Sequence, residues 1–304
     1  MRMMRFLLAI LLLVAAQAAP AQSDRGRPLV LLVHGRGMID RDTALTRKLW
    51  MDGLRTGAST LTKAPLLEES DVRVVWYADV LDPSSDAGCD YPANDPRALR
   101  AGRSDEGLKT VASVAGGLFG ALSKLVDDKE TAAQMRDLAG DAAFLSDARK
   151  RCASEDRLSS AILRARSEGR PVIVVAHSLG SLVAYDYFSA ARDTGTVRTL
   201  LTLGSPLGSP DLRHLLIGGD DSDSLARPVS VADWINIRND GDPFATSVTA
   251  ANHDIASKPP ADEPDPHELV GYLREPETAR QVVAAWCGAF AKAVQAPKGC
   301  AELK

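Results

Sequence analysis

The chain has 304 residues, of which 36 are Lys or Arg and 40 are Asp or Glu, and its formal net charge is −4. This acidic balance argues against a nucleic-acid-binding protein, because such proteins typically carry an excess of basic residues. Hydrophobic residues make up 45% and charged residues 25%, which excludes a disordered chain and indicates a globular protein. The length suits one large α/β domain or two smaller ones.

The first residues are typical of an export signal. Two arginines precede an apolar run at residues 6–16, which is too short to cross a membrane but suits the central region of a signal peptide. Ala-Pro-Ala at 19–21 then provides a cleavage motif. We expect a signal peptide at residues 1–21 and a periplasmic or secreted domain at residues 22–304, without a later transmembrane segment. An uncleaved anchor is the alternative.

Four cysteines follow, namely Cys89, Cys152, Cys287 and Cys300. An even number in an exported chain predicts two disulfides, for which three pairings are possible. The pairing that joins sequence neighbours links Cys89 to Cys152 and Cys287 to Cys300. The cysteines show no CxxC spacing and no histidine clusters with them, so a zinc site is not expected.

Apolar runs rich in β-branched residues predict five strands. They cover residues 29–33, 72–80, 172–176, 197–203 and 231–237. Helical spacing of apolar residues predicts helices at 44–54, 180–192 and 278–294. Strands separated by helices indicate an α/β fold with a mainly parallel, doubly wound sheet. In such a sheet the functional loops gather at the carboxyl ends of the strands.

A long segment at about residues 83–158 interrupts this alternation. Its first part is rich in Asp, Pro and Gly, and apolar residues then recur at helical spacing in 108–125 and 135–145. We expect an insertion with two helices, which either packs on the core or forms a cap or lid over a substrate cleft. A Cys89–Cys152 disulfide would join the base of this insertion.

The third predicted strand leads directly into residues 176–180, which read AHSLG, and a predicted helix follows at once. This segment resembles the nucleophile elbow of the α/β-hydrolase superfamily, which includes bacterial lipases and esterases. Its pattern is G-x-S-x-G, and Ala176 replaces the first glycine here. A strained turn exposes the serine hydroxyl, and the small residues on either side allow the backbones to approach. The resemblance implies Ser178 as the nucleophile.

The first predicted strand ends in His34, Gly35, Arg36 and Gly37, which resemble the His-Gly oxyanion loop of lipases and esterases. The resemblance implies that the backbone N–H groups of Arg36 and Leu179 form the oxyanion hole, where fixed donors stabilise developing negative charge. We expect His34 to support the loop rather than act as a base. The Arg36 side chain is expected to reach solvent, with contact to a negatively charged substrate as the alternative.

In this superfamily the acid and then the histidine base follow the serine along the chain. The fifth predicted strand leads into an Asn-Asp-Gly-Asp-Pro turn, where Asp242 is the expected acid and Asp240 the alternative. The position of His267 before a tyrosine and the last helix resembles the ending of bacterial lipase-like hydrolases. We expect His267 to be the base, with His253 as the alternative.

The Gly-Ser-Pro segment at 204–206 resembles a loop beside the active site of these hydrolases, and we expect Ser205 to line the cleft without chemistry. The sequence has no phosphate-binding loop, dinucleotide fingerprint or HExxH motif, so no cofactor or metal is expected. The resemblance implies an esterase or lipase that acts on a small-molecule or lipid ester through an acyl-enzyme. An acyltransferase, thioesterase or amidase with the same residues, and a non-catalytic binding protein, remain alternatives.

Overall fold

The structure is a computed structural model that describes residues 24–39, 41–64, 66–101, 140–190, 197–209 and 225–303. The expected signal peptide lies outside the described residues. So does the first expected helix of the insertion, together with the start of the second. The division of the chain into domains therefore stays a prediction.

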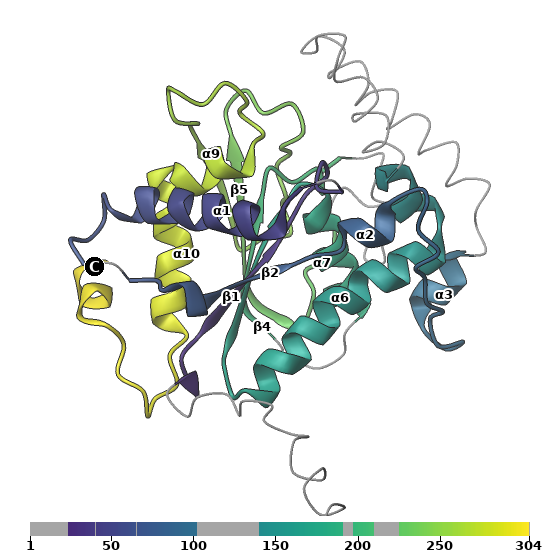
Figure 1. The fold of residues 1–304 in the computed structure, drawn as a ribbon, viewed down its shortest axis with the longest axis horizontal. Coiled ribbons are helices and arrows are strands. Elements are labelled where there is room, and N and C mark those ends of the chain that lie inside the picture. The colour runs from purple at the N-terminus through teal and green to yellow at the C-terminus, as the bar shows by residue number, and fades with distance from the viewer. Residues whose placement is uncertain are drawn as a thin grey trace, which may run out of the picture.

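Six parallel strands form one sheet in the order β2-β1-β3-β4-β5-β6 (Figure 1). The strands are β1 (Leu29–Val33), β2 (Val72–Val75), β3 (Val172–His177), β4 (Val197–Leu203), β5 (Val231–Asn239) and β6 (His253–Ser257). The α/β class and the parallel sheet are thus confirmed for the described part of the chain. All six strands run the same way, so their carboxyl ends share one edge of the sheet.

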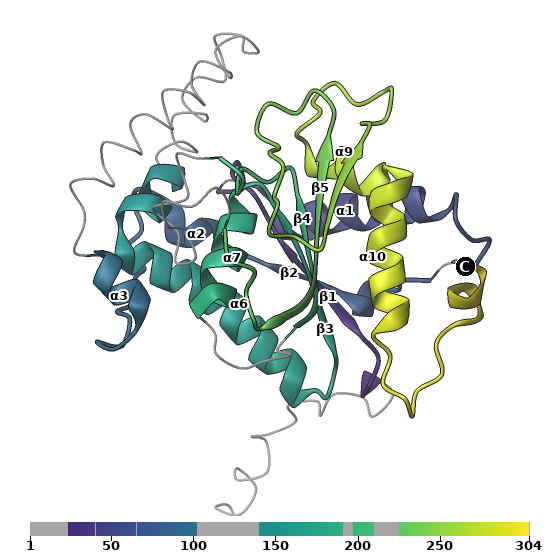
Figure 2. The ribbon, with the colours of Figure 1, turned by 180° about the vertical axis from the view of Figure 1, so that it is seen from behind.

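Helices cover both faces of this sheet. They are α1 (Thr43–Ala58), α2 (Ala78–Leu81), α3 (Pro96–Ala101), α6 (Ala148–Ser167), α7 (Leu179–Ala190), α9 (Leu269–Arg274) and α10 (Pro276–Gly288), with short 3-10 helices η2 (Glu69–Asp71) and η3 (Lys298–Leu303). Figures 1 and 2 show α1, α9 and α10 on one face and α6 and α7 on the other. Among the residues that the structure describes, no helix is both long and apolar enough to span a membrane.

The position of strand β1 between two helical layers explains why its sequence is apolar without interruption. Leu29, Leu31 and Val33 belong to the core that includes side chains of α6 and α7. Val30 and Leu32 belong to the second core, which includes side chains of α1 and α10. Successive side chains of a strand point to opposite faces, so a strand between two helical layers must be apolar at every position.

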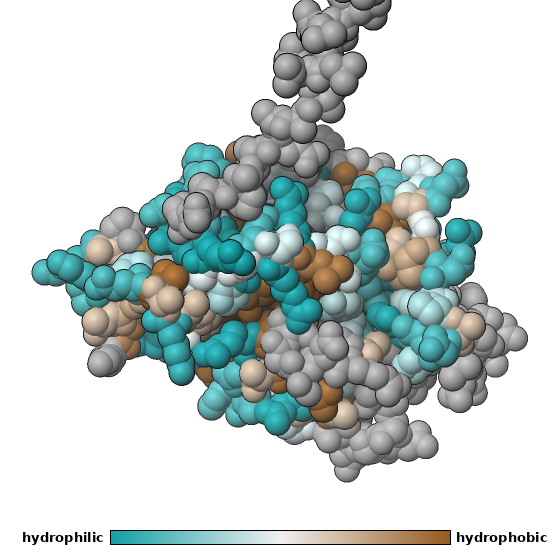
Figure 3. Space-filling view, turned by 90° about the horizontal axis from the view of Figure 1, so that it is seen from below, coloured by the Kyte–Doolittle hydropathy of each residue, from teal (hydrophilic) through white to brown (hydrophobic). Residues whose placement is uncertain are grey.

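Several predicted boundaries are wrong, and the last predicted helix, α10, ends at Gly288 rather than at residue 294. The second strand ends at Val75 rather than at residue 80, because residues 78–81 form α2. Helix α6 was not predicted, since its 20 residues are rich in Arg and Ser and show only a weak apolar stripe. Strand β6 was also missed, because it lies at the sheet edge and is mostly exposed. Figure 3, a view from below, shows hydrophilic residues mixed with apolar ones on the described surface.

Both expected disulfides are present. Cys89 pairs with Cys152 and Cys287 with Cys300, each with 5.5 Å between the Cα atoms. The pairing between sequence neighbours is therefore confirmed. The first disulfide joins the segment after α2 to α6, and the second joins α10 to η3. Each closes a loop and so reduces the conformational entropy of the unfolded chain.

Candidate active site

Ser178 lies on the sharp turn between β3 and α7. Its φ angle is +51°, and it is the only residue other than glycine with a positive φ in the described ranges. A non-glycine residue in this region is strained and needs support from its surroundings. Its backbone N–H donates to the Leu203 carbonyl oxygen over 3.0 Å. The turn is thus tied to the neighbouring strand β4, and the hydroxyl stands at the carboxyl edge of the sheet.

Gly180 permits this turn. A Cβ atom at this position would lie 2.4 Å from the His34 carbonyl oxygen and 2.6 Å from that of Val33. These atoms belong to the backbone at the end of β1 and cannot move aside. The small residue in the AHSLG segment is therefore required by the close approach of α7 to β1.

A chain of hydrogen bonds joins Ser178, His267 and Asp242. The Ser178 hydroxyl lies 2.8 Å from Nε2 of His267. Nδ1 of His267 lies 2.9 Å and 3.0 Å from the two carboxylate oxygens of Asp242. An ionised carboxylate only accepts, so Nδ1 carries the proton and Nε2 is free to accept one from the hydroxyl. This arrangement has the geometry that a general base needs.

The carboxylate of Asp242 has three further donors. The backbone N–H groups of Phe244 and Ala245 donate to one oxygen over 2.8 Å and 3.2 Å, and the Tyr272 hydroxyl donates to the other over 2.6 Å. Burial opposes ionisation of Asp242, but the hydrogen bonds from His267, Tyr272 and Phe244 outweigh it and lower the pKa of Asp242. Burial and the charge of Asp242 raise the pKa of Tyr272, so its hydroxyl stays a donor.

The alternative residues lie elsewhere. Asp240 is exposed on the turn after β5, and His253 is exposed on the edge strand β6. Hydrogen bonds place His267 with Asp242 instead. The structure therefore brings together the three residues that the sequence resemblance implied.

His34 and His177 are buried beside this centre and are held in the neutral form. Burial lowers the pKa of His34 to about 4 and that of His177 to about 3. In His34, Nδ1 donates to the Gly35 carbonyl oxygen, and Nε2 accepts from the N–H of Tyr77. Nε2 of His177 donates to the backbone carbonyl oxygen of His267 over 2.8 Å. His177 thus positions the loop that carries the base, a role that sequence reasoning missed.

The expected oxyanion loop passes directly beside the serine. A Cβ atom at Gly35 would lie 2.9 Å from Cβ of Ser178. Leu179 is the first residue of α7, so its N–H is unsatisfied within the helix and lies at the positive end of the helix dipole. Among the described residues, neither this N–H nor that of Arg36 has a hydrogen-bond acceptor. Within this part of the chain, both N–H groups are thus free to donate to an oxygen atom of a ligand.

The loop after β4 packs closely against the acid and the base. Gly204 has a φ angle of +55°, and a Cβ atom there would lie 2.9 Å from the Asp242 carboxylate and 3.2 Å from Nδ1 of His267. Only glycine fits both constraints, which sequence reasoning did not recognise. Ser205 is fully buried, and its hydroxyl lies 2.7 Å from that of Ser181 at the start of α7. It supports the helix rather than lining an open cleft.

The side chain of Arg36 does not reach solvent as expected. Only 15% of it is exposed, and its Nη1 lies 3.5 Å from the Asp141 carboxylate. Its guanidinium carbon lies 4.7 Å from the centre of the Phe244 ring. The expectation was wrong because Asp141 and Phe244, both remote in sequence, enclose the side chain from two sides.

Within the ranges described above, no three His, Cys, Asp or Glu side chains form a group that could hold a metal ion. Comparison with known proteins adds no assignment, because no family model, curated protein or solved structure matches the chain. Function is therefore inferred from the geometry of the site.

Proposed function

We propose that this protein is an exported serine hydrolase of the α/β-hydrolase superfamily that cleaves carboxylic esters as an esterase or lipase. One observation carries the proposal, namely the hydrogen-bond chain from Ser178 through His267 to Asp242, with the serine on a strained strand-to-helix turn. The resemblance of residues 176–180 to a nucleophile elbow and the parallel sheet support it. A group strained in this way at a sheet edge is typical of functional sites.

In this proposal the Ser178 hydroxyl oxygen attacks the carbonyl carbon of the ester, and Nε2 of His267 takes its proton. The tetrahedral intermediate carries its negative charge near the N–H groups of Arg36 and Leu179. His267 then gives the proton to the departing alcohol oxygen, and an acyl-enzyme on Ser178 remains. Water attacks this acyl group with His267 again as the base, and the carboxylic acid leaves.

Asp242 has two tasks in this cycle. Its hydrogen bonds with Nδ1 hold His267 in the tautomer that can accept the serine proton. Its negative charge also stabilises the imidazolium that forms during each proton transfer. The low pKa of Asp242 supports this role, because the carboxylate keeps its charge well below neutral pH.

Two disulfides and the signal-like first residues support the proposed export. The last residues of the expected insertion belong to α6, which packs on the sheet, so we propose a cap over the site only for the part of the insertion before α6. Support comes from its described end, where Asp141 pairs with Arg36 of the proposed oxyanion loop. This ion pair brings one residue of the insertion beside the proposed oxyanion loop.

The test is hydrolysis of a p-nitrophenyl ester series, from C2 to C16 acyl chains, by the mature wild-type protein and Ser178→Ala. Loss of the nucleophile is expected to lower kcat/KM by at least ~10³-fold. Ser205→Ala is the matched control, because it removes a neighbouring buried serine and is expected to lose less than about tenfold.

The preferred chain length then separates an esterase from a lipase. Product analysis with an added alcohol shows whether the acyl group goes to water or to a second acceptor. A wild-type protein that hydrolyses no ester and does not react with a fluorophosphonate would overturn the proposal and favour a binding protein.

A further inference from the structure

The guanidinium of Arg36 is a mostly buried cation with unmatched hydrogen-bond donors. Its Nη1 atom is buried without a hydrogen-bond partner, and the group donates no hydrogen bond to any residue in the described ranges. Buried polar groups in folded proteins nearly always have such partners, and a guanidinium carries five N–H donors. An unmatched arginine therefore calls for a functional explanation.

Two neighbouring side chains hold the guanidinium in place without accepting ordinary hydrogen bonds from it. The Asp141 carboxylate lies 3.5 Å from Nη1, which is an ion pair but longer than an ordinary hydrogen bond. The Phe244 ring lies below the guanidinium at 4.7 Å and supplies a cation–π contact, which offers no acceptor lone pair. The side chain is thus oriented, and within the described part of the chain no acceptor takes up its donors.

The guanidinium stands close to the proposed reaction centre. The Phe244 ring contacts both groups, since its centre lies 4.7 Å from the guanidinium carbon and 4.5 Å from the centre of the His267 ring. Arg36 and Asp141 also line a small pocket together with Leu179 and Met38, which has a cavity volume of about 20 Å³ and is partly open to solvent. Leu179 carries one of the proposed oxyanion donors, so the pocket adjoins the place where the ester carbonyl would bind.

We propose that the Arg36 side chain binds a carboxylate of the substrate, so that the preferred substrates are esters that carry a free acid group a few carbons from the scissile carbonyl. This inference rests on the proposed function and narrows its substrate class. A guanidinium matches a carboxylate in shape and charge and forms short, charge-assisted hydrogen bonds with it. Asp141 offsets part of the positive charge while the site is empty and orients the guanidinium toward the pocket.

The test compares esters that differ only in this charge. Monomethyl adipate is paired with methyl hexanoate, and monomethyl glutarate with methyl pentanoate, with hydrolysis followed by pH-stat. The wild-type protein is expected to prefer the acidic ester of at least one pair in kcat/KM. Arg36→Met is expected to lower the ratio of acidic to neutral ester roughly 10- to 100-fold. Arg36→Lys, which keeps the charge but not the planar donors, should lie between the two.

Asp141→Asn is the matched variant with the opposite expectation, because it leaves the positive charge of Arg36 unopposed and should raise the same ratio. Binding provides a readout that does not need turnover. Adipate is titrated calorimetrically into Ser178→Ala and into Ser178→Ala/Arg36→Met, and heat of binding is expected only for the first. Circular dichroism of each variant establishes that it is folded.

Equal losses on acidic and neutral esters in Arg36→Met would show that the guanidinium only positions the loop, and would overturn the inference while ester hydrolysis stands. Adipate that binds equally well without Arg36 would also overturn it. The p-nitrophenyl ester series and the fluorophosphonate reaction decide the proposed function separately, and if they show no activity the adipate titration alone decides whether Arg36 binds a carboxylate.

Discussion

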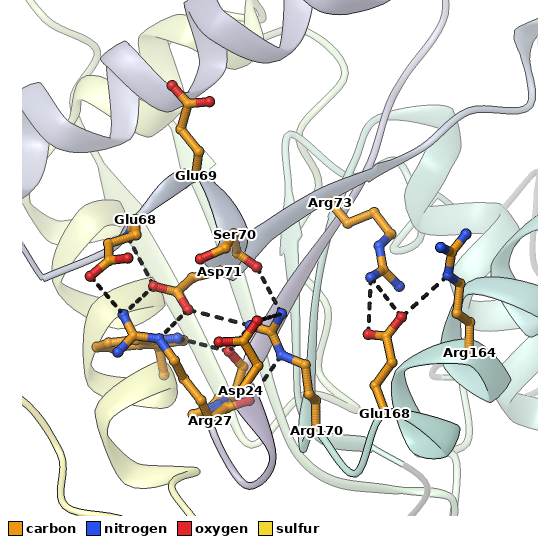
Figure 4. Close-up of polar contacts among 12 residues, drawn as sticks. Asp24, Arg27, Glu68, Glu69, Ser70, Asp71, Arg73, Arg164, Glu168 and Arg170 are labelled. Carbon is orange, nitrogen blue, oxygen red and sulfur yellow. Dashed lines mark hydrogen bonds and ion pairs between the residues drawn. The ribbon is translucent and has the colours of Figure 1, made fainter. Parts of the chain in front are cut away.

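Two charged regions, one at the amino ends and one at the carboxyl ends of the strands, differ in how completely their polar groups are paired. At the amino end, a cluster of Arg27, Asp71 and Arg170 surrounds a fully buried carboxylate (Figure 4). Arg27 donates to both oxygens of Asp71 over 2.5 Å and 2.6 Å, and Arg170 donates to one of them over 3.3 Å. Arg170 also donates to three backbone carbonyl oxygens nearby.

At the carboxyl end the polar groups are only partly paired. The Arg36 guanidinium makes no hydrogen bond to a described residue, Ser178 is strained, and the N–H of Leu179 has no acceptor in the same part of the chain. Desolvation makes unpaired groups costly for folding. The comparison indicates that the amino-end cluster serves stability, whereas the carboxyl end retains groups that a ligand can satisfy.

The largest expected effect at the carboxyl end is that of Asp242→Asn on activity. The amide can donate to Nδ1 of His267 and thereby favour the wrong tautomer, so kcat/KM for a p-nitrophenyl ester should fall by ~10³- to 10⁴-fold. Asp240→Asn, two residues away and exposed, is the control and should stay within about twofold. A loss of comparable size in Asp240→Asn would instead make Asp240 the acid.

The counterpart at the amino end is Asp71→Asn, which should affect stability and not chemistry. Removing the charge leaves Arg27 and Arg170 without their buried partner, so the free energy of unfolding should fall by about 3–5 kcal/mol in urea denaturation. The kcat of the folded variant should match that of the wild type. Glu68→Gln is the control, because Glu68 also faces Arg27 but is 74% exposed, and it should cost less than about 1 kcal/mol. Equal costs for both variants would contradict the contrast between the two regions.

The smallest expected effect is the loss of folding stability in acid that the buried histidines at the carboxyl end cause. His34 and His177 at the carboxyl end have pKa values lowered to about 4 and about 3 by burial, whereas unfolded histidines have a pKa of roughly 6.5. The unfolded chain therefore binds protons first, and stability that is complete above that value is lost as the pH falls toward 4. Between pH 6.5 and 5.5 the free energy of unfolding should decrease by about 2 kcal/mol.

Urea denaturation at several pH values measures this loss. His253→Gln should not change the slope, because His253 is exposed on β6. His177→Asn should flatten it by removing one of the two buried groups. A slope that is the same in all three proteins would show that other groups dominate the acid response.

Local patterns in the sequence were sufficient for most of the sheet and for the serine turn. Strand β1 was predicted because burial on both faces requires every residue to be apolar, and the AHSLG segment because a tight turn requires small residues. Strand β6 and helix α6 escaped prediction. An exposed edge strand and a polar helix take their stability from neighbours that are remote in sequence.

The sequence by itself determined the α/β class and the three residues to examine at the site, because each depends on residue types at short spacing or on chain order, whereas the structure selected one of three possible disulfide pairings. Only the tertiary structure decided that His267 meets Asp242 rather than Asp240, and that Arg36 is enclosed by Asp141 and Phe244. These contacts join loops from different strands at one edge of the sheet. No pattern along the chain specifies which of the side chains there come within hydrogen-bonding distance.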